Sequence, residues 1–591
     1  MKQHVLPALF LLCFFGNPAP SPGQEAGWSQ DPPELESLVA FDRTQSDLRV
    51  AVQRFQEDRR ALARRWDVPY SPTRRARYEA FYGGWMEALE DVNFDDLNHE
   101  GQVDYVLMRT ALEFELEMLA QEAQGASEMA PLTPFAAAIG ELQEARRDHE
   151  DVEPRAAAAV LHDVANEVES LSSALRAGTG ELPPIKAVAA ERAAGFTEQM
   201  RQVLEDWHGF YDGYDPLFTW WAQKPYERLD AALDDHARAI RETLVGDASS
   251  GPVIGDPIGP EGLRAHLAHE MIPYSGEELI AIAEAEFAWM EQALLEASRE
   301  MGYGDDWKAA QEAVKELAVD PGLKPAVVRD LAAQSVEFIG ERDWITMPPL
   351  AEEVWRMEMM SPERQLVSPF FLGGETIRIS YPTDDMAHDD KLMSMRGNNP
   401  HFNRATVHHE LIPGHHLQGF MTSRFNDHRQ PFSTPFWGEG WALYWEMLLW
   451  EADFPRSPED RIGMLFWRMH RAARIIFSLS FHLERMTPQE AVDFLVDRVG
   501  HERANAEAEV RRSFEGNYSP LYQVAYMIGG MQFRALHTEL VESGQMTARQ
   551  FHDTVLQGGR MPVEMVRARL TGQRLTRDYT TAWRFAGDPN P

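Results

Sequence analysis

Five of the chain's 20 histidines fall in one short segment, from His401 to His416. The core of this segment reads His409-Glu410-Leu-Ile-Pro-Gly-His415-His416. A zinc hydrolase needs a His-Glu pair followed one or two helical turns later by another histidine. The imidazole nitrogens bind zinc, and the glutamate takes a proton from a water molecule beside the metal. The segment therefore predicts a zinc site with His409 as a ligand and Glu410 as the general base.

The spacing of the second histidine differs from the usual HExxH, in which two histidines four residues apart share a helix face. His415 follows His409 by six residues, which in a straight helix means a rise of about 9 Å and a rotation of about 120° off that face. Proline removes an N–H and clashes with the preceding turn, whereas glycine permits a widened turn. We predict that Pro413 and Gly414 bulge the helix and return His415 to the metal. His416, about 10.5 Å along a straight axis, is the competing ligand.

A third protein ligand is needed, and cysteine is unavailable. The chain contains 1 cysteine, Cys13, which lies in an N-terminal apolar run that we interpret below as a signal peptide. A predicted helix begins near Phe436, and Glu439 lies close to its start between two glycines. A carboxylate from a following helix completes a His-His-Glu zinc site, so Glu439 is the predicted third ligand. Glu446 lies on nearly the same face two turns later. It is either a partner that orients a ligand histidine or a surface acid.

The blocks HELIPGHHLQ and GEGWALYWE resemble the bacterial family called domain of unknown function 885. Its members look like distant relatives of the helical gluzincin peptidases, which include angiotensin-converting enzyme, thimet oligopeptidase and the thermostable carboxypeptidases. The resemblance is strongest from about Gly373 to Gly530. It implies a large, mainly α, peptidase-like fold with a deep central cleft and zinc at the cleft floor. In the family pattern His409 and His415 match metal ligands, Glu439 the third ligand and Glu410 the general base.

Two further segments resemble the family. The stretch Gln523-Val-Ala-Tyr526-Met-Ile-Gly529 resembles its Gln-Ala-x-x-Tyr-x-x-Gly stretch. The stretch that ends at His482 resembles one that usually carries Asp and Gly where this chain has Ser478 and Ser480. The relatives use tyrosine or histidine donors to stabilise the oxyanion of a tetrahedral intermediate. The resemblance therefore implies Tyr526 as the first candidate donor and His482 as the second.

Composition excludes other classes of function. The chain has 591 residues, with 94 acidic against 56 basic, and a formal net charge of -38, so it would repel a nucleic acid. Residues 1–23 contain an apolar run of 11 residues, Val5 to Phe15, after Lys2 and before small residues. This pattern predicts a signal peptide and an exported protein, periplasmic or extracellular. No later stretch approaches the length of a transmembrane segment.

Helical periodicity dominates the rest of the chain. It predicts helices over 34–66, 74–91, 103–123 and 228–245, and a further helix around 161–175 that stops at Gly178. A loop is predicted over 246–262, and Thr376 to Tyr381 predicts one short strand. The predicted class is mainly α with a minor β element. We expect a helical region over 24–250 and a metal-site region over 251–591, forming two lobes around the cleft.

The predicted function is a zinc-dependent metallopeptidase that hydrolyses short peptides by zinc-activated water, with Glu410 as general base. Arg471 or Arg474 is a candidate to bind the substrate's C-terminal carboxylate, which would make the enzyme a carboxypeptidase or a dipeptide-releasing enzyme. One alternative is a non-catalytic, metal-containing binding protein. Another is a non-haem iron enzyme with a two-histidine, one-carboxylate site, which has no need of Glu410. A second His-Glu pair, His269-Glu270, is interpreted as incidental because no histidine follows it closely.

Overall fold

The computed structural model describes residues 36, 40–41, 45–179, 183–246, 253–367, 370–515 and 518–587. These residues are mostly α-helical, with one two-stranded sheet, which confirms the predicted class. The predicted signal peptide over 1–23, with Cys13, lies outside the described residues. Among the helices that the structure describes, none is long and apolar enough to cross a bilayer.

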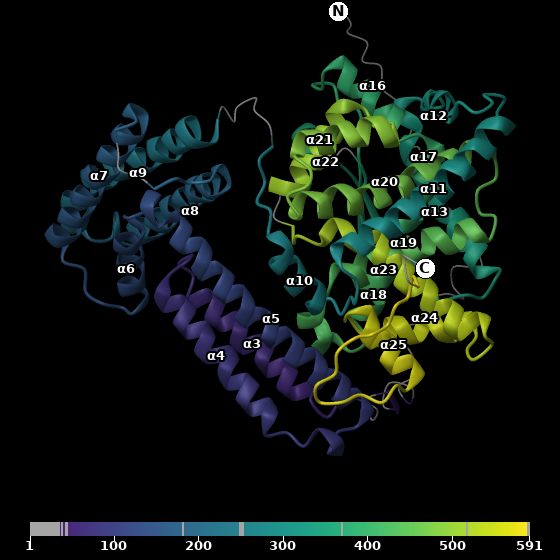
Figure 1. Cartoon of the computed structure of the whole chain (residues 1–591), viewed down its shortest axis with the longest axis horizontal. Helices are drawn as coiled ribbons and strands as arrows, with labels where there is room; N and C mark the ends of the chain where they lie inside the picture. The colour runs from purple at the N-terminus through teal and green to yellow at the C-terminus, as the bar shows by residue number, and fades with distance from the viewer. Residues whose placement is uncertain are drawn as a thin grey trace, which may run out of the picture.

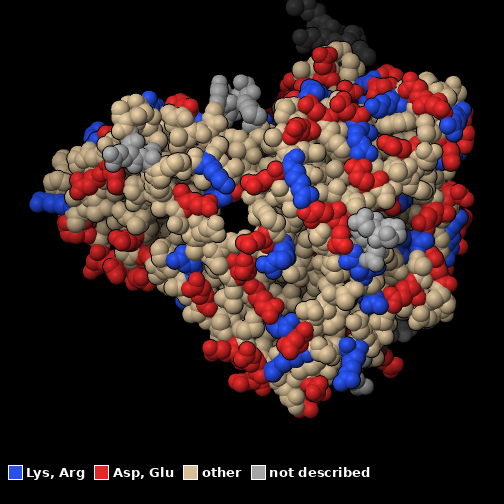
Figure 2. Space-filling model, viewed as in Figure 1, with Lys and Arg blue, Asp and Glu red and all other residues tan. Residues whose placement is uncertain are grey.

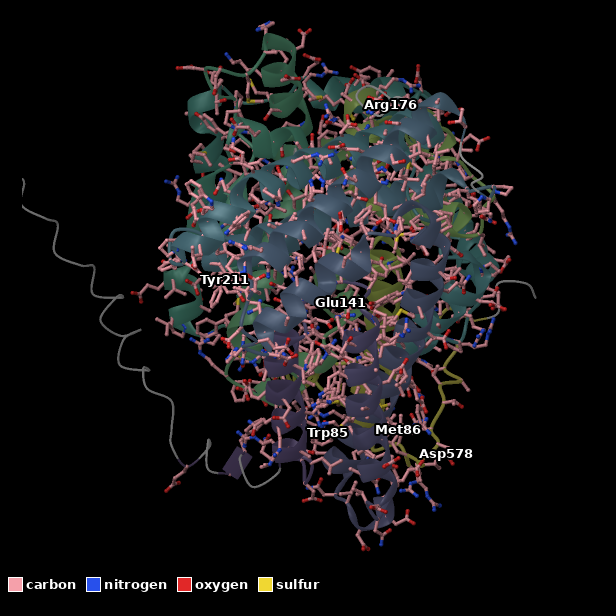
Figure 3. All side chains as sticks on the ribbon, turned by 90° about the vertical axis from the view of Figure 1, so that its left-hand side faces the viewer. Trp85, Met86, Glu141, Arg176, Tyr211 and Asp578 are labelled. Carbon is pink, nitrogen blue, oxygen red and sulfur yellow. The ribbon has the colours of Figure 1, made fainter. Side chains whose placement is uncertain are left out.

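The helices form an arm, over described residues between 45 and 246, and a larger body, from residue 253 onward (Figure 1). The arm contains α3 (Arg49–Arg65), α4 (Pro72–Glu90), α5 (His99–Met129), α6 (Ala136–Arg147), α7 (Pro154–Ala177), α8 (Ala187–Tyr211), α9 (Pro216–Ile240) and the π-helical turn Arg241–Val245. The first three run side by side along the lower edge of Figure 1, and the others gather at the arm's far end. Figure 3 looks at the arm from that end, with Trp85 near the bottom and Arg176 near the top.

The body contains the remaining helices and both strands. They are α10 (Gly259–His269), α11 (Gly276–Glu300), α12 (Trp307–Lys315), α13 (Lys324–Gly340), α14 (Pro349–Val354), β1 (Arg356–Met359), α15 (Pro362–Val367), β2 (Thr376–Ile379), α16 (His388–Gly397), α17 (Pro400–Glu410), α18 (His415–Thr422), α19 (Pro435–Glu451), α20 (Pro458–His482), α21 (Pro488–Phe494), α22 (Arg503–Glu515), α23 (Tyr522–His537), α24 (Ala548–Gln557) and α25 (Val563–Thr571). Short segments of 3-10 or π-helix lie at 94–96 and 130–132 in the arm, and at 321–323, 427–432, 495–499 and 538–542 in the body.

The helices predicted over 74–91, 103–123, 161–175 and 228–245 are found, but capping residues move some of their ends. Of the helix predicted over 34–66, the structure describes residues 36, 40–41 and 45–66. Residues 45–48 are not helical and α3 begins at Arg49, so one continuous helix is wrong. The helix α5 starts before residue 103 because the Asn98 side chain accepts a hydrogen bond from Gly101 N and caps it. The helix α9 starts before residue 228 because Asp215 caps it and Pro216 occupies its first turn. At the end of α7, Gly178 has a φ of 63°, the left-handed conformation that stops a helix, as predicted.

The predicted strand is present as β2, which pairs in parallel with β1. Of the predicted loop over 246–262, residues 247–252 lie outside the described residues and 253–258 have no regular secondary structure. The last residues of the prediction are helical instead, because Gly259 and Pro260 open α10. The two strands lie between α14 and α16 in the chain and belong to a small apolar cluster with Val407 and Leu411. The minor β element therefore packs against α17, the helix that carries the predicted histidine ligand.

Glycines let four helices of the body approach at backbone distance. A Cβ on Gly440 of α19 would lie 2.5 Å from backbone atoms of Gly529 on α23. A Cβ on Gly463 of α20 would lie 2.3 Å from the carbonyl oxygen of His401 on α17. Such distances exclude any side chain larger than hydrogen. One contact holds α19 against α23 and the other holds α17 against α20, and α17, α19 and α23 contribute residues to the site described below.

A fully buried ion cluster joins the arm to the body. The Asp104 carboxylate on α5 accepts hydrogen bonds from Arg429 Nε at 2.6 Å and from His428 Nε2 at 2.8 Å. Burial alone would raise the pKa of Asp104, but the Arg429 guanidinium and His428 hold that pKa at about 2. The carboxylate therefore stays ionised, and the contact ties the arm to the body.

Between arm and body the structure has a cavity of about 760 Å³, lined by residues of α5, α8 and α10. Figure 2 shows an opening between arm and body on this face, with acidic and basic side chains around it. The lining includes Glu117, Glu122 and Arg192, and it includes none of the predicted site residues. The predicted cleft with zinc at its floor therefore stays a prediction.

Candidate metal centre

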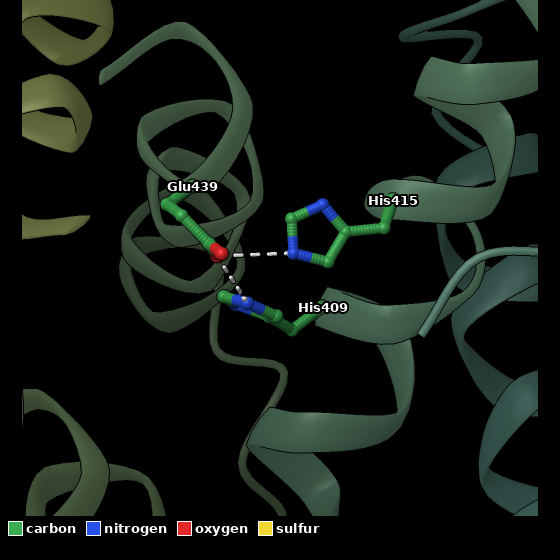
Figure 4. Close-up of side chains that lie close together, drawn as sticks. All are labelled: His409, His415 and Glu439. Atoms are coloured by element: carbon green, nitrogen blue, oxygen red, sulfur yellow. Dashed lines mark hydrogen bonds and ion pairs between the residues drawn. The ribbon is translucent and has the colours of Figure 1, made fainter. Parts of the chain in front are cut away.

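Three side chains from three helices converge in the body (Figure 4). The ligand atoms of His409, His415 and Glu439 all lie within 4.8 Å of one another. The Oε2 atom of Glu439 is 3.1 Å from His415 Nε2 and 3.5 Å from His409 Nε2. The His409 side chain is buried, whereas the His415 and Glu439 side chains are 21% and 13% exposed, so one side of the cluster reaches solvent. We call these three residues the metal cluster.

The chain between the two histidines breaks the helix instead of bulging it, so the predicted bulge is wrong. Helix α17 ends at Glu410, Leu411 leaves the helical region with φ -109° and ψ -107°, and α18 begins at His415. The Ile412–Pro413 peptide bond is cis. A Cβ on Gly414 would lie 1.8 Å from the carbonyl oxygen of His409, so only glycine fits there. The break places His415 at the start of a new helix, close to His409.

The rings of His415 and His416 point in different directions, and this distinguishes the two candidate ligands. His415 points its Nε2 at Glu439. His416 points the other way and donates from Nε2 to the backbone carbonyl of Ala351 at 2.6 Å. Its ring is buried there, with its other close ring contact on Phe420. His415 is therefore the residue that joins the metal cluster.

A second carboxylate orients His409. Glu446 is buried and accepts a hydrogen bond from His409 Nδ1 at 2.7 Å. Because a carboxylate only accepts, Nδ1 carries a hydrogen, and Nε2, which faces Glu439, is the nitrogen that could bind a metal once it loses its proton. This is the arrangement by which a carboxylate fixes the tautomer of a metal-binding histidine. Of the two predicted roles for Glu446, the structure shows the partner of a histidine and excludes a surface acid.

The histidines and glutamates of the site stabilise one another's charged forms. Burial alone would lower the pKa of His409, but its interactions with Glu439 and Glu446 outweigh burial and raise that pKa to about 9. Burial would likewise raise the pKa of Glu439, but His415 and His409 hold it well below its ordinary value. Without a metal, the cluster therefore pairs an ionised carboxylate with protonated imidazole. Metal binding has to release that proton.

Glu410 lies beside the cluster without belonging to it. Burial raises the pKa of its carboxyl group, with His409, His415 and Glu439 as close charged neighbours. The backbone at Gly373 packs directly on it: a Cβ there would lie 2.0 Å from Glu410 Oε2. Glu410 is therefore confined between this loop and the metal cluster.

Tyrosines of α23 cover the other side of Glu439. The Tyr522 hydroxyl donates a hydrogen bond of 2.6 Å to Glu439 Oε1, and the Tyr526 hydroxyl donates to Tyr522 at 3.3 Å. The Tyr526 ring lies parallel to the His409 ring, with centroids 6.2 Å apart. Burial raises the pKa of both phenols, so both keep their protons and act as donors.

Residues 53–570 match the family described as "Bacterial protein of unknown function (DUF885)". The chain belongs to this family. Two solved structures are similar to this DUF885 protein across most of both chains. One, a "putative lipoprotein of unknown function from Shewanella oneidensis", is 16% identical with a TM-score of 0.62, covering 88% of this chain and 98% of its own. The other, a "putative lipoprotein from Colwellia psychrerythraea", is 14% identical with a TM-score of 0.54, covering 89% and 97%.

These two similarities show a shared fold. No match is found among the curated proteins. The family match confirms the resemblance drawn from the HELIPGHH and GEGWALYWE blocks, and both blocks lie inside the matched range.

The other predicted donor, His482, is placed differently from Tyr526. It is the last residue of α20, packs its ring against Phe481 and Phe514, and has its pKa lowered to about 4 by burial. Among the described residues, its ring contacts and hydrogen bonds do not reach the metal cluster. Tyr526, whose ring faces His409, is the candidate donor that the geometry of this DUF885 protein favours.

The remaining histidines of the segment, His401 and His408, stay outside the cluster. His401 hydrogen-bonds through Nδ1 to Asp460 at 2.7 Å. His408 is buried with its ring edge-on to Phe454, and burial lowers its pKa to about 4. Sequence reasoning missed Tyr522. A signal was available, because Tyr522 precedes Tyr526 by four residues on a helix, and residues four apart share a helix face.

Proposed function

We propose that this protein is a zinc-dependent metallopeptidase that hydrolyses short peptides. The observation that carries the proposal is the metal cluster with Glu410 beside it: three ligand atoms lie within 4.8 Å of one another, and the loop at Gly373 packs directly on the Glu410 carboxyl group. Export to the periplasm or the cell exterior belongs to the same proposal. It is supported by the pattern of residues 1–23 and by the lipoprotein description of both structural neighbours.

The donor set fits zinc. Zinc binds histidine nitrogen and carboxylate oxygen at about 2.0–2.2 Å in a tetrahedron, so two ligand atoms should lie about 3.3 Å apart. The Glu439 Oε2 atom lies 3.1 Å and 3.5 Å from the two Nε2 atoms. Two histidines and a glutamate also suit iron, but an oxygenase has no use for Glu410 as a base. Two histidines with one carboxylate are a catalytic zinc set that leaves one position for water or substrate.

Each side chain has a distinct task in the proposed reaction. A bound zinc ion would supply a Lewis acid that polarises the peptide carbonyl and makes water more acidic. Glu410 accepts a proton from the attacking water and passes it to the leaving amine, for which its raised pKa suits it. The Tyr526 hydroxyl donates to the oxyanion of the tetrahedral intermediate. Glu446 keeps His409 in the tautomer that presents Nε2.

Arg471 is the better of the two arginines as a receptor for a substrate carboxylate. Its guanidinium lies over the Tyr526 ring at 4.7 Å, and its Nε is buried without a hydrogen-bond partner among the described residues. Arg474 lies at the same distance from that ring but is already bonded to Glu509 at 2.6 Å. A free C-terminal carboxylate would satisfy Arg471 through a charge-assisted contact. The proposal therefore favours a carboxypeptidase or a dipeptide-releasing enzyme.

A digest of a peptide library, read by mass spectrometry, tests the function. We expect cleavage that stops with a zinc chelator and returns when zinc is added back. A matched library with amidated C-termini should be cut poorly if Arg471 binds the carboxylate. Purified protein that contains stoichiometric iron and no zinc, or cleavage that survives Glu410→Gln, would contradict the proposed mechanism.

A further inference from the structure

The two oxygens of Glu439 have different partners. Oε2 faces both histidines of the metal cluster. Oε1 accepts the hydrogen bond from the Tyr522 hydroxyl at 2.6 Å, which is shorter than the contacts of Oε2 with the two histidines. One oxygen is therefore directed at the metal position, and the other is already occupied by a donor.

The different partners of the two Glu439 oxygens affect how many coordination positions of a bound metal would stay open for water or substrate. A carboxylate that binds through both oxygens takes two coordination positions, whereas one that binds through a single oxygen takes one. A catalytic zinc site has three protein ligands and keeps its fourth position open for water or substrate. A second oxygen from Glu439 would compete for that open position.

We propose that Tyr522 is a positioning residue that holds Glu439 in single-oxygen coordination by occupying Oε1. This inference rests on the metal site of the proposed function. It assigns Tyr522 a task separate from that of Tyr526, whose hydroxyl is free to turn toward a substrate once it releases the 3.3 Å contact with Tyr522.

The surrounding structure fixes Tyr522 in this position. Its ring packs edge-on against Tyr526, with centroids 5.6 Å apart, and lies at 4.4 Å from the Tyr518 ring. The backbone contact between Gly440 and Gly529 sets the spacing of α19 and α23 one residue away from Glu439. The hydroxyl therefore meets Oε1 without any movement of either helix.

The test compares Tyr522→Phe with Tyr518→Phe. The first removes the hydroxyl that contacts Glu439, while phenylalanine keeps the ring contacts. The second removes a hydroxyl from the neighbouring ring, for which no hydrogen bond is found among the described residues. Zinc dissociation constants are measured by chelator competition, and circular dichroism checks that both variants fold. Loss of a partner that orients a metal ligand costs about 10–100-fold in affinity. We expect that loss for Tyr522→Phe and none for Tyr518→Phe.

Zinc X-ray absorption supplies a second readout that loss of packing would not move. With Tyr522 present, the spectrum should fit one carboxylate oxygen at bonding distance. With phenylalanine, Glu439 is free to add its second oxygen, and the coordination number should rise. An unchanged affinity together with an unchanged spectrum for Tyr522→Phe would overturn the inference.

Neither measurement uses a peptide, so the inference and the proposed function can fail separately. Zinc binding that weakens in Tyr522→Phe, in a wild-type protein that cuts no peptide, keeps the inference and rejects the peptidase. Peptide cleavage by wild-type protein, with zinc binding equal in all variants, keeps the peptidase and rejects the task of Tyr522.

Discussion

The chain contains the pattern His-Glu-x-Ile-Pro twice, at His269–Pro273 and at His409–Pro413. Both copies end a helix: His269 is the last residue of α10, and Glu410 is the last residue of α17. Their surroundings differ. The His269 ring stacks on Phe114 with centroids 4.1 Å apart, whereas His409 meets the carboxylates of Glu439 and Glu446 from α19.

The pKa of the histidine in the His-Glu pair is therefore shifted in opposite directions in the two copies. Burial lowers the pKa of His269 to about 4, so its imidazole is neutral. At His409 the two carboxylates outweigh burial and raise the pKa to about 9. A His-Glu pair at a helix end is thus not a metal site by itself. Carboxylates contributed by another helix make the second copy a candidate metal site.

The residues after the proline also differ. Tyr274 and Ser275 follow the first copy, and Ser275 caps the start of α11. Gly414 and His415 follow the second copy. Gly414 approaches the His409 carbonyl more closely than any other residue could, and His415 opens α18 toward the cluster. The glycine and the second histidine distinguish the two copies in sequence, and the carboxylates of α19 distinguish them in space.

The largest expected effect comes from removing the histidine of each copy. His409→Ala deletes a metal ligand, and zinc affinity should fall by more than the roughly 100-fold seen when only a ligand's partner is lost. His269→Ala should leave zinc content unchanged. Plasma mass spectrometry on dialysed protein measures both. Full zinc content in His409→Ala would show that the metal cluster is not the zinc site.

Changing the two glutamates to glutamine separates chemistry from binding. Glu410→Gln removes the proposed base, and peptide hydrolysis should fall about 10²–10⁴-fold. Its zinc content should stay near that of wild type, because Glu410 does not belong to the metal cluster. Glu270→Gln should leave hydrolysis unchanged. Equal losses in both variants would indicate a general effect of burial on the fold and would contradict the role of Glu410.

The contrast between the two copies also shows which features of the site can be predicted from the sequence. Residue type and spacing were enough to predict the helical class and to single out His409 and Glu439, which the structure brings together. They were not enough to predict the broken helix, because Gly414 acts through a backbone contact with His409 that no periodicity encodes. The partner role of Glu446 was one of two options because spacing along the sequence does not show that His409 of α17 packs against this face of α19 and buries Glu446 there. Helix ends were misplaced where Asn98 and Asp215 cap helices outside the apolar pattern.

The carboxylate partner of His409 provides a further test of the comparison, since no carboxylate among the described residues contacts His269. Glu446→Ala removes the acceptor for His409 Nδ1 and should weaken zinc binding about 10–100-fold. The matched control is Glu451→Ala on the same helix, which breaks only a partly exposed ion pair with Arg534. Chelator competition on both variants provides the measurement. Equal affinities would mean that the tautomer of His409 does not depend on Glu446.

The smallest expected effect concerns the free energy of unfolding, and it involves Glu270 in the first copy of the pattern. Burial raises the pKa of Glu270 to about 8, and Thr434 only partly offsets this. The folded state therefore keeps a proton on Glu270 that the unfolded state releases above pH about 4.5. The stabilisation that comes from this difference in proton binding is fully present below that pH. It is lost as pH rises toward 8. Over that window the free energy of unfolding should fall by about 1.4 kcal/mol per pH unit more in wild type than in Glu270→Gln. Chemical denaturation at pH 6 and pH 7 measures the difference. Parallel pH profiles would mean that Glu270 titrates near its ordinary pKa, and the two His-Glu pairs would then differ only in their histidines.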